Sequence, residues 1–265
     1  MDQITQAASS VSLAQYNLIY NGFSFTIAVM GAVTLFLWLS RSQVAPAYRG
    51  AITLSGLVTA IALYHYVRIA GSWSDAFVIN GDTITAGNIA FNDAYRYVDW
   101  LLTVPLLLVE LILVMRLSAT ETRRRAITLG GLAAAMVVLG YPGEISSDPS
   151  TRWLWWSLAM IPFAAIVYQL YVGLGASIAS QPESARGLVK SARDLTVLSW
   201  CFYPIVFIAP MVGFTGGWSE TAVQVGYSIA DIVAKAVFGI LIYQIAVRKS
   251  EAEGWTDGQR VAAAA

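Results

Sequence analysis

The amino-acid sequence predicts an all-α membrane protein, a bundle of seven transmembrane helices. Of its 265 residues, 57% are hydrophobic and only 12% are charged, and the mean hydropathy of +0.62 is too high for an ordinary soluble domain. A helix needs about 20 mainly apolar residues to cross a bilayer core. The sequence contains seven such stretches, at 17–39, 51–70, 92–115, 126–141, 153–177, 188–212 and 221–247.

Polar links join these helices, and all are short except the link between the second and third helices. Residues 71–91 in that link alternate polar and apolar side chains around Asn80-Gly81-Asp82, a turn signal typical of a β-hairpin. We therefore expect a small hairpin there. No internal repeat or low-complexity segment divides the sequence, so residues 1–265 are predicted to form one domain, with a disordered tail at 249–265.

The basic residues predict how the helices are oriented, although the formal net charge is zero. Arg68 and Arg152 flank one side of the membrane, and Arg96 and Lys235 lie within helices. The other twelve fall in the first, third and fifth links and in the tail: Arg41, Arg49, Arg116, Arg123, Arg124, Arg125, Arg186, Lys190, Arg193, Arg248, Lys249 and Arg260. Because cytoplasmic loops are rich in Lys and Arg, we expect a cytoplasmic C-terminus and an N-terminus outside. Residues 1–15 have no basic segment, so the first helix should remain as an anchor.

Ionisable side chains inside the predicted helices are candidates for function, because each costs about 2.5 kcal/mol or more in a bilayer. They are His65, Arg96, Asp99, Glu110, Asp231 and Lys235. The alternative interpretation is a structural ion-pair cluster that holds the helices together. Lys235 has only apolar or small residues near it toward Arg248, so it cannot easily reach water and must be paired, neutral or modified.

A buried lysine amine is the usual starting point for a Schiff base with an aldehyde. Asp231 precedes Lys235 by four residues, one helical turn, and therefore lies on the same face of the helix. This position suits a counterion to a protonated Schiff base.

The predicted helix 92–115 carries four functional candidates on one face. Arg96, Asp99, Thr103 and Glu110 are spaced by three, four and seven residues, as expected for one stripe of a helix. Because this helix runs inward, Arg96 lies nearest the outside. Glu110 follows eleven residues after Asp99, about 16 Å deeper toward the cytoplasm at 1.5 Å per residue.

The surroundings of these carboxyl groups predict a direction for proton transfer. Asp99 and Asp231 are expected to be ionised near Arg96, whereas the apolar neighbours of Glu110 favour a protonated carboxyl group. An ionised acceptor outside Lys235 and a protonated donor inside it predict outward transfer. A structural ion-pair cluster would not need this separation.

His65, the single histidine, lies within about two turns of the outer end of its helix, at roughly the depth of Asp99. It is either a partner of Asp99 or a core histidine that is hydrogen-bonded to the backbone.

Three segments resemble microbial (type 1) rhodopsins: RYVDWLLTVPL at 96–106, WCFYP at 200–204 and ADIVAK at 230–235. Their order and spacing fit along all seven helices, so the resemblance covers essentially the whole chain. It implies all-trans retinal bound covalently to Lys235. Asp99, Thr103 and Glu110 resemble the Asp-Thr-Glu signature of proton-pumping proteorhodopsins and xanthorhodopsins, which implies a proton acceptor, an intervening threonine and a cytoplasmic proton donor.

The same resemblance assigns further roles. His65 falls where these pumps carry a histidine that pairs with the acceptor, Asp231 becomes a second counterion, and Arg96 becomes an extracellular charge gate. Sodium pumps carry Asn-Asp-Gln at the signature and chloride pumps lack its first acid, and neither departure occurs here. The segment YPGE at 141–144 resembles the fourth link of the xanthorhodopsin-like branch, so Glu144 is either an extracellular carboxyl group of the mechanism or an exposed loop acid without a role.

The resemblance also implies a retinal pocket. Trp100 and Trp200 resemble the pair that sandwiches the polyene, Tyr203 lies near the Schiff base, and Pro204 bends its helix. Leu107 matches the position at which green-absorbing proteorhodopsins carry leucine and blue-absorbing forms carry glutamine. We therefore expect green absorption.

Carotenoid-binding relatives carry a glycine at the position that Trp156 occupies here, so the resemblance makes a carotenoid antenna unexpected. If the alignment shifts by one residue, Trp155 is equally bulky.

The expected partners are the lipid bilayer and further copies of the chain, as a pentamer or hexamer. No nucleic acid and no obligatory protein partner are indicated. The resemblance implies a multi-pass protein of the bacterial inner membrane.

Three other functions compete with a light-driven proton pump. A photosensory receptor shares the fold, but such sensors commonly lack a donor carboxyl group like Glu110. A retinal-free bundle with a buried ion-pair network is the second. An enzyme is the least favoured, because the sequence shows no metal cluster, nucleophile motif or phosphate-binding loop.

Overall fold

The computed structural model describes residues 11–255, and over this range it contains seven helical spans that are long and apolar enough to cross a membrane. This confirms the predicted seven-helix fold. The spans are α2 (Leu13–Leu39), α3 (Arg49–Asp75), α4 (Ala94–Met115), α5 (Ala119–Glu144), α6 (Pro149–Tyr168) with the π-helical η3 (Gln169–Gly173), α8 (Glu183–Ile208) with η4 (Ala209–Val212), and α9 (Gly217–Asp231), η5 (Ile232–Val237) and α10 (Phe238–Ala252) as one span. Short helices η1 (Ser40–Gln43), η2 (Pro46–Tyr48) and α7 (Gly175–Ala179) lie in the links.

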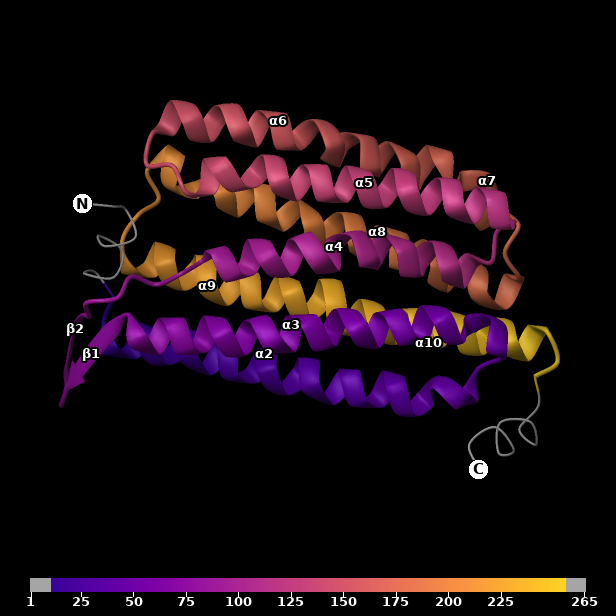
Figure 1. Cartoon of the computed structure of the whole chain (residues 1–265), viewed down its shortest axis with the longest axis horizontal. Coiled ribbons are helices and arrows are strands. Elements are labelled where there is room, and N and C mark those ends of the chain that lie inside the picture. The colour runs from indigo at the N-terminus through magenta and orange to yellow at the C-terminus, as the bar shows by residue number, and fades with distance from the viewer. Residues whose placement is uncertain (1–10, 256–265) are drawn as a thin grey trace.

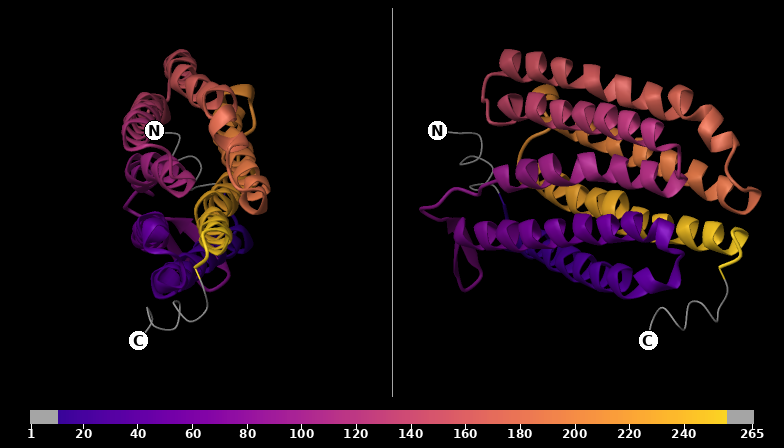
Figure 2. Two further views of the ribbon diagram at one scale, coloured as in Figure 1. Left: turned by 90° about the vertical axis from the view of Figure 1, so that its right-hand side faces the viewer. Right: turned by 45° about the vertical axis from the view of Figure 1, so that its right-hand side comes forward.

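The seven spans lie side by side along one axis, and each of the first five packs against the next in the chain (Figure 1). The last span returns to contact α2, α3 and α8. Seen along the axis, α3, α4 and α5 face α8 and the last span (Figure 2). Side chains of α4 and of the α9 to α10 span are therefore brought together in the interior.

The predicted β-hairpin is present at one end of the bundle (Figure 1). Strand β1 (Phe77–Asn80) pairs antiparallel with β2 (Thr83–Ala86), and Asn80 lies opposite Thr83. Gly81 has φ +62°, which only glycine adopts at little cost. We call this end of the bundle the hairpin end and the other, where α10 ends, the α10 end.

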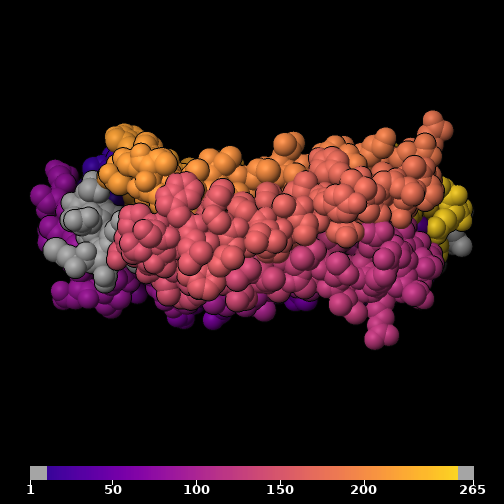
Figure 3. All heavy atoms as spheres, turned by 90° about the horizontal axis from the view of Figure 1, so that it is seen from above, coloured from indigo at the N-terminus to yellow at the C-terminus, as the bar shows by residue number. Residues whose placement is uncertain are grey.

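The surface of the bundle is apolar, as a protein surrounded by lipid requires. Figure 3 shows the face formed by α5, α6 and α8. On α6 and α8, Ile161 is 66% exposed and Leu198 is 71% exposed. A soluble protein rarely exposes a large continuous apolar surface.

Several helix boundaries differ from the predicted ones, most clearly those of α5 and α10. Helix α5 begins at Ala119 rather than 126, because Ser118 caps it by accepting from the Glu121 amide at 3.3 Å and polar residues occupy its first turns. It also continues to Glu144. The predicted disordered tail is wrong for residues 249–252, which continue α10, while the predicted tail residues 256–265 lie outside the described residues.

Candidate functional site

Lys235 lies in the interior of the bundle, on the π-helical turn η5, and is 1% exposed. Its ammonium group donates to the Asp99 carboxylate on α4 and lies 3.0 Å from Asp231 Oδ2, one turn earlier on its own span. Both aspartates are 1% exposed. A π-helical turn within an α-helix often marks a functional position. Because two carboxylates face one buried ammonium, the site can hold a positive charge at this nitrogen.

Asp231 is fixed by three further donors from three other helices. The Tyr203 hydroxyl donates to Oδ1 at 2.6 Å, the Trp100 indole donates to Oδ1 at 3.2 Å, and the Tyr66 hydroxyl donates to Oδ2 at 2.9 Å. Tyr66 was not among the predicted site residues. A tyrosine in an apolar helix is too common a signal to have identified it from one sequence.

Asp99 is less completely hydrogen-bonded. Its Oδ1 has no hydrogen-bond partner among the described residues, and the Thr103 hydroxyl donates to its backbone oxygen at 2.8 Å rather than to the carboxylate. His65 Nδ1 lies 3.7 Å from Oδ1, outside hydrogen-bond range, and lies 2.9 Å from the Ile61 backbone oxygen. His65 thus combines both predicted arrangements, a backbone hydrogen bond and a place beside Asp99.

Arg96 is buried on the same face of α4, but its partners differ from those predicted. Its guanidinium lies 3.3 Å from Asp93 Oδ1 and donates to Gln224 Oε1. No hydrogen bond or ion pair joins it to Asp99 or Asp231 within residues 11–255. The Arg96 guanidinium therefore makes its polar contacts toward the hairpin end, not with the two carboxylates beside Lys235.

Glu110 lies on α4 on the side of Lys235 nearer the α10 end, and it is 0% exposed. Neither carboxyl oxygen has a hydrogen-bond partner in the part of the chain that the structure describes. The hydroxyl of the neighbouring Ser55 donates to the Ala51 backbone oxygen at 3.1 Å. A carboxylate without a donor in such surroundings is costly, so the geometry favours a protonated carboxylic acid.

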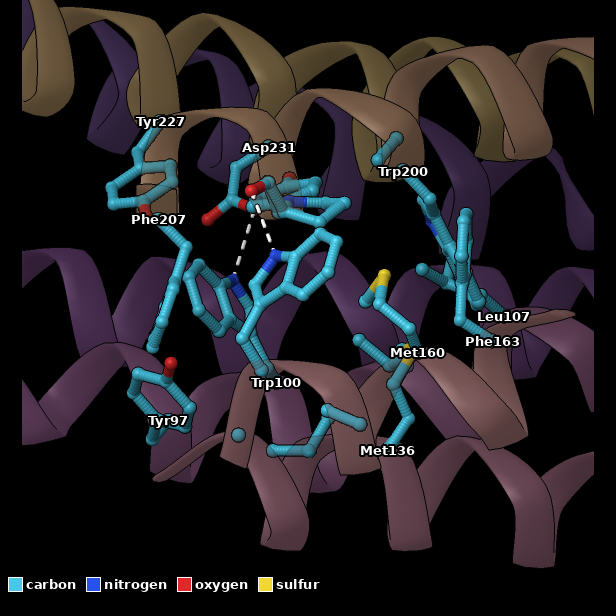
Figure 4. A pocket seen from close by; sticks show the side chains of 18 of the residues that line it. Tyr97, Trp100, Leu107, Met136, Met160, Phe163, Trp200, Phe207, Tyr227 and Asp231 are labelled. Carbon is cyan, nitrogen blue, oxygen red and sulfur yellow. Dashed lines mark hydrogen bonds between the residues drawn. The ribbon is translucent and has the colours of Figure 1, made fainter. Parts of the chain in front are cut away.

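A cavity extends from Lys235 between α4, α5, α6 and α8. Its empty volume, including the space at its open mouth, is about 770 Å³. Every predicted pocket residue lines it, namely Trp100, Leu107, Trp200, Tyr203 and Pro204. Figure 4 shows Trp100 pointing toward Asp231, with Trp200, Leu107 and Phe163 gathered on the other side.

Other lining residues were not predicted: Tyr97, Val104, Met136, Val137, Gly140, Ala159, Met160, Phe163, Phe207, Tyr227 and Ala234. Most of them are apolar or aromatic. Apolar residues are too frequent in a membrane helix for sequence alone to identify those that face a cavity.

Two more predicted positions are Trp156 and Glu144, of which only Trp156 lines the cavity. The Trp156 indole donates to the Pro204 backbone oxygen at 3.0 Å, joining α6 to α8. Glu144 is the last residue of α5, and its side chain is only 22% exposed. It lies 3.8 Å from Arg152 and accepts from the Tyr97 hydroxyl at 3.5 Å. Of the two alternatives for Glu144, the exposed loop acid is therefore wrong, because Pro142 does not end the helix.

The site fits retinal. The cavity offers one buried amine at Lys235 for an aldehyde, two carboxylates to balance the charge of a protonated imine, and an apolar, aromatic lining for a conjugated chain. The Lys235 ammonium lies where the nitrogen of such an imine would lie. Among the described residues no cluster of three His, Cys, Asp or Glu side chains could hold a metal ion.

Comparisons with known proteins identify similar chains over nearly the whole length. The family model described as bacteriorhodopsin-like protein matches residues 19–249. The structure of xanthorhodopsin, a light-driven ion pump with dual chromophore, superposes with a TM-score of 0.90 at 48% identity and covers 94% of this chain and 100% of its own.

Two curated proteorhodopsins are each 31% identical to the chain. The blue-light absorbing protein of Gamma-proteobacterium Hot 75m4 covers 86% of this chain and 87% of its own length. The green-light absorbing protein of Gamma-proteobacterium EBAC31A08 covers 87% and 88%.

Proposed function

Because the chain belongs to the bacteriorhodopsin-like family, we propose that it is a light-driven outward proton pump with all-trans retinal bound covalently to Lys235. Retinal bound there supplies visible absorption and a light-driven isomerisation. The observation that carries the proposal is the placement of carboxyl groups on both sides of one nitrogen. Asp99 and Asp231 contact Lys235, and Glu110 lies apart from it toward the α10 end.

Asp99 is the group that would receive the proton from the Lys235 nitrogen. It contacts that nitrogen directly, and its Oδ1 accepts no hydrogen bond from the described residues. Asp231 is less suited to this role, because three side chains besides Lys235 hold it and stabilise its negative charge. Asp231 would therefore stay ionised as the fixed counterion. Asp99 would take up the proton, and its ion pair with the Lys235 nitrogen would be lost.

Glu110 would return a proton to the nitrogen from the other side. Among the described residues neither oxygen of its buried carboxyl group accepts a hydrogen bond by distance and angle, as suits a stored proton. Its position also argues against the photosensory alternative, because a receptor does not need a dedicated donor on the far side of the nitrogen.

The outward direction depends on the orientation of the bundle. The hairpin end holds Asp93, Arg96 and Glu220, while the α10 end carries most of the basic link residues. By the positive-inside rule, the α10 end faces the cytoplasm of a bacterial inner membrane. Protons would then enter past Glu110 and leave past Arg96, the charge gate.

Light-induced pH change in a suspension of retinal-supplied cells tests the proposal. The medium should acidify in light, and a protonophore should abolish the acidification. If the medium does not acidify in light, or if the protonophore enhances the acidification, active outward pumping is excluded. Lys235→Ala tests the attachment site separately, because a visible absorption band in the purified variant would place retinal elsewhere.

Three further features belong to the same proposal. Leu107 lines the cavity, in keeping with green absorption, and Trp156 occupies the wall through which a carotenoid would reach retinal. Assembly into a pentamer or hexamer stays a prediction from the resemblance. Analytical ultracentrifugation in detergent of known density would measure the oligomer.

A further inference from the structure

The α10 end of the bundle is closed by a lysine that has no part in the proposed transfer. Lys249 is 4% exposed, and its ammonium donates to the backbone oxygens of Val114 at 3.0 Å and Met115 at 2.9 Å, and to Gln181 Oε1 at 2.7 Å. Val114 and Met115 form the last turn of α4, whose free carbonyl groups favour a cation. We call Lys249 and Gln181, with the carbonyl groups of Val114 and Met115, the latch.

Gln181 connects the latch to the other half of the bundle. It is 5% exposed and lies in the link between α7 and α8. Its Nε2 donates to the Met115 oxygen at 3.2 Å and to the Ser177 oxygen at 3.0 Å, and the Arg186 guanidinium donates to its backbone oxygen at 3.0 Å. The latch therefore joins the ends of three spans, α4, α10 and the beginning of α8.

The latch stands between Glu110 and the α10 end. Val114 follows Glu110 by one helical turn, a rise of about 6 Å. Tyr48, which is 0% exposed, places its ring 5.3 Å from the Lys249 ammonium and fills the side toward α3. A proton that approaches Glu110 along the end of α4 comes close to the Lys249 ammonium, whose positive charge repels it.

The polar groups of the latch satisfy one another, so a partly broken latch would leave a buried charge or carbonyl group without a partner. Separating Lys249 from Gln181 would therefore require water to solvate the ammonium and the amide. An intermediate opening is unfavourable.

We propose that the latch gates proton uptake by Glu110, and that Lys249 and Gln181 separate once in each light-driven cycle. This inference rests on the proposed function and adds the residues that control entry of the proton. Lys249 is a positioning residue here, since it neither contacts Lys235 nor takes up the transported proton.

The lysines of the chain provide a direct test. There are three, and in the retinal-loaded protein Lys235 is blocked, Lys190 is exposed and Lys249 is buried. The full-length pigment in lipid nanodiscs is treated with an amine-acylating reagent in darkness and in continuous light, and each site is quantified by mass spectrometry. We expect Lys249 to react about 10-fold faster in light, which corresponds to a tenfold larger open population, with Lys190 unchanged. Equal rates at Lys249 in light and darkness overturn the latch, whether or not the protein pumps.

A pair of variants tests the link to proton uptake. Gln181→Leu removes one partner of Lys249 but keeps both of its carbonyl contacts, and Ser180→Ala is the matched control at the exposed neighbouring residue of the same link. After a flash, a pH dye follows uptake from the medium. We expect Gln181→Leu to accelerate uptake several-fold without changing the absorption maximum or proton transfer to Asp99. Uptake equal to that of Ser180→Ala overturns the gate, whereas a wild-type protein that fails to acidify the medium overturns the proposed pump itself.

Discussion

Lys235 and Asp99 form a buried ion pair between the last span and α4, although 136 residues separate them in the sequence. Each side chain is 1% exposed. Removing one partner of such a pair leaves an uncompensated charge, which typically costs about 3–5 kcal/mol. The ground state of the site is therefore tied to the ionised Asp99 carboxylate, and the proposed proton transfer neutralises both partners at once.

Asp99→Asn should abolish pumping and shift the absorption maximum to the red. An amide cannot accept the proton, and it no longer stabilises the positive charge of the ground state beside Lys235. Absorption spectra and light-induced pH change measure both effects. Asp194→Asn, which makes the same chemical change at an exposed site beside Tyr171, is the control. A variant that still acidifies the medium would remove Asp99 from the acceptor role.

Glu110→Gln should slow the return of the proton to the Lys235 nitrogen by about 100-fold, the lower range for loss of a positioned acid. The absorption maximum should not change, since Glu110 lies apart from the buried ion pair. Flash photolysis at neutral pH measures the rate. Glu183→Gln, on an exposed first turn of α8, controls for loss of an acid. Normal kinetics in Glu110→Gln would exclude the donor role.

Tyr66→Phe should destabilise the protein by about 1.5–3 kcal/mol, because it removes a donor to the buried Asp231 carboxylate without changing the shape of the core. Thermal loss of the visible band in the dark measures this. Tyr20→Phe, at a side chain that is 40% exposed, should change it little. If the Tyr66→Phe pigment were as stable as the Tyr20→Phe pigment, the other donors to Asp231 would be sufficient to stabilise its carboxylate.

The parts of the site that could be predicted from sequence are those set by spacing along one helix. The stripe of α4 and the pair Asp231 and Lys235 follow from the helical repeat, and all of these side chains are buried. Contacts between helices could not be predicted in the same way. The Tyr66 hydrogen bond to Asp231 and the Gln224 partner of Arg96 depend on how the spans pack, which no periodicity encodes.

The ends of the spans were also hard to predict, because hydropathy detects only their apolar centres. Lys249 falls in the predicted disordered tail, because it is charged and follows the last apolar run. In the structure, α10 continues past it, and the carbonyl groups at the end of α4 provide partners that make its burial possible. A lysine that is satisfied by another helix has no signature in its own segment.

Leu107→Gln should shift the absorption maximum from the green toward the blue. Leu107 is 2% exposed and lines the cavity, so a polar amide there would change the field along the bound chromophore. Spectra of the purified pigments measure the shift. Leu106→Gln is a control on the same helix, because Leu106 does not line the cavity. A wild-type pigment that already peaks in the blue would contradict the expectation drawn from Leu107.

Trp156→Gly should open the cavity wall between α6 and α8. The indole lines the cavity and donates to the Pro204 backbone oxygen at 3.0 Å, so its removal deletes both a barrier and a bond between these spans. With a keto-carotenoid added, excitation of the carotenoid should drive acidification in the variant but not in the wild-type protein. Trp153→Gly, which removes a 40% exposed indole in ring contact with Trp156, controls for loss of bulk on α6. Carotenoid-driven acidification by the wild-type protein would contradict the single-chromophore proposal, because it requires a second pigment to be held beside an intact Trp156.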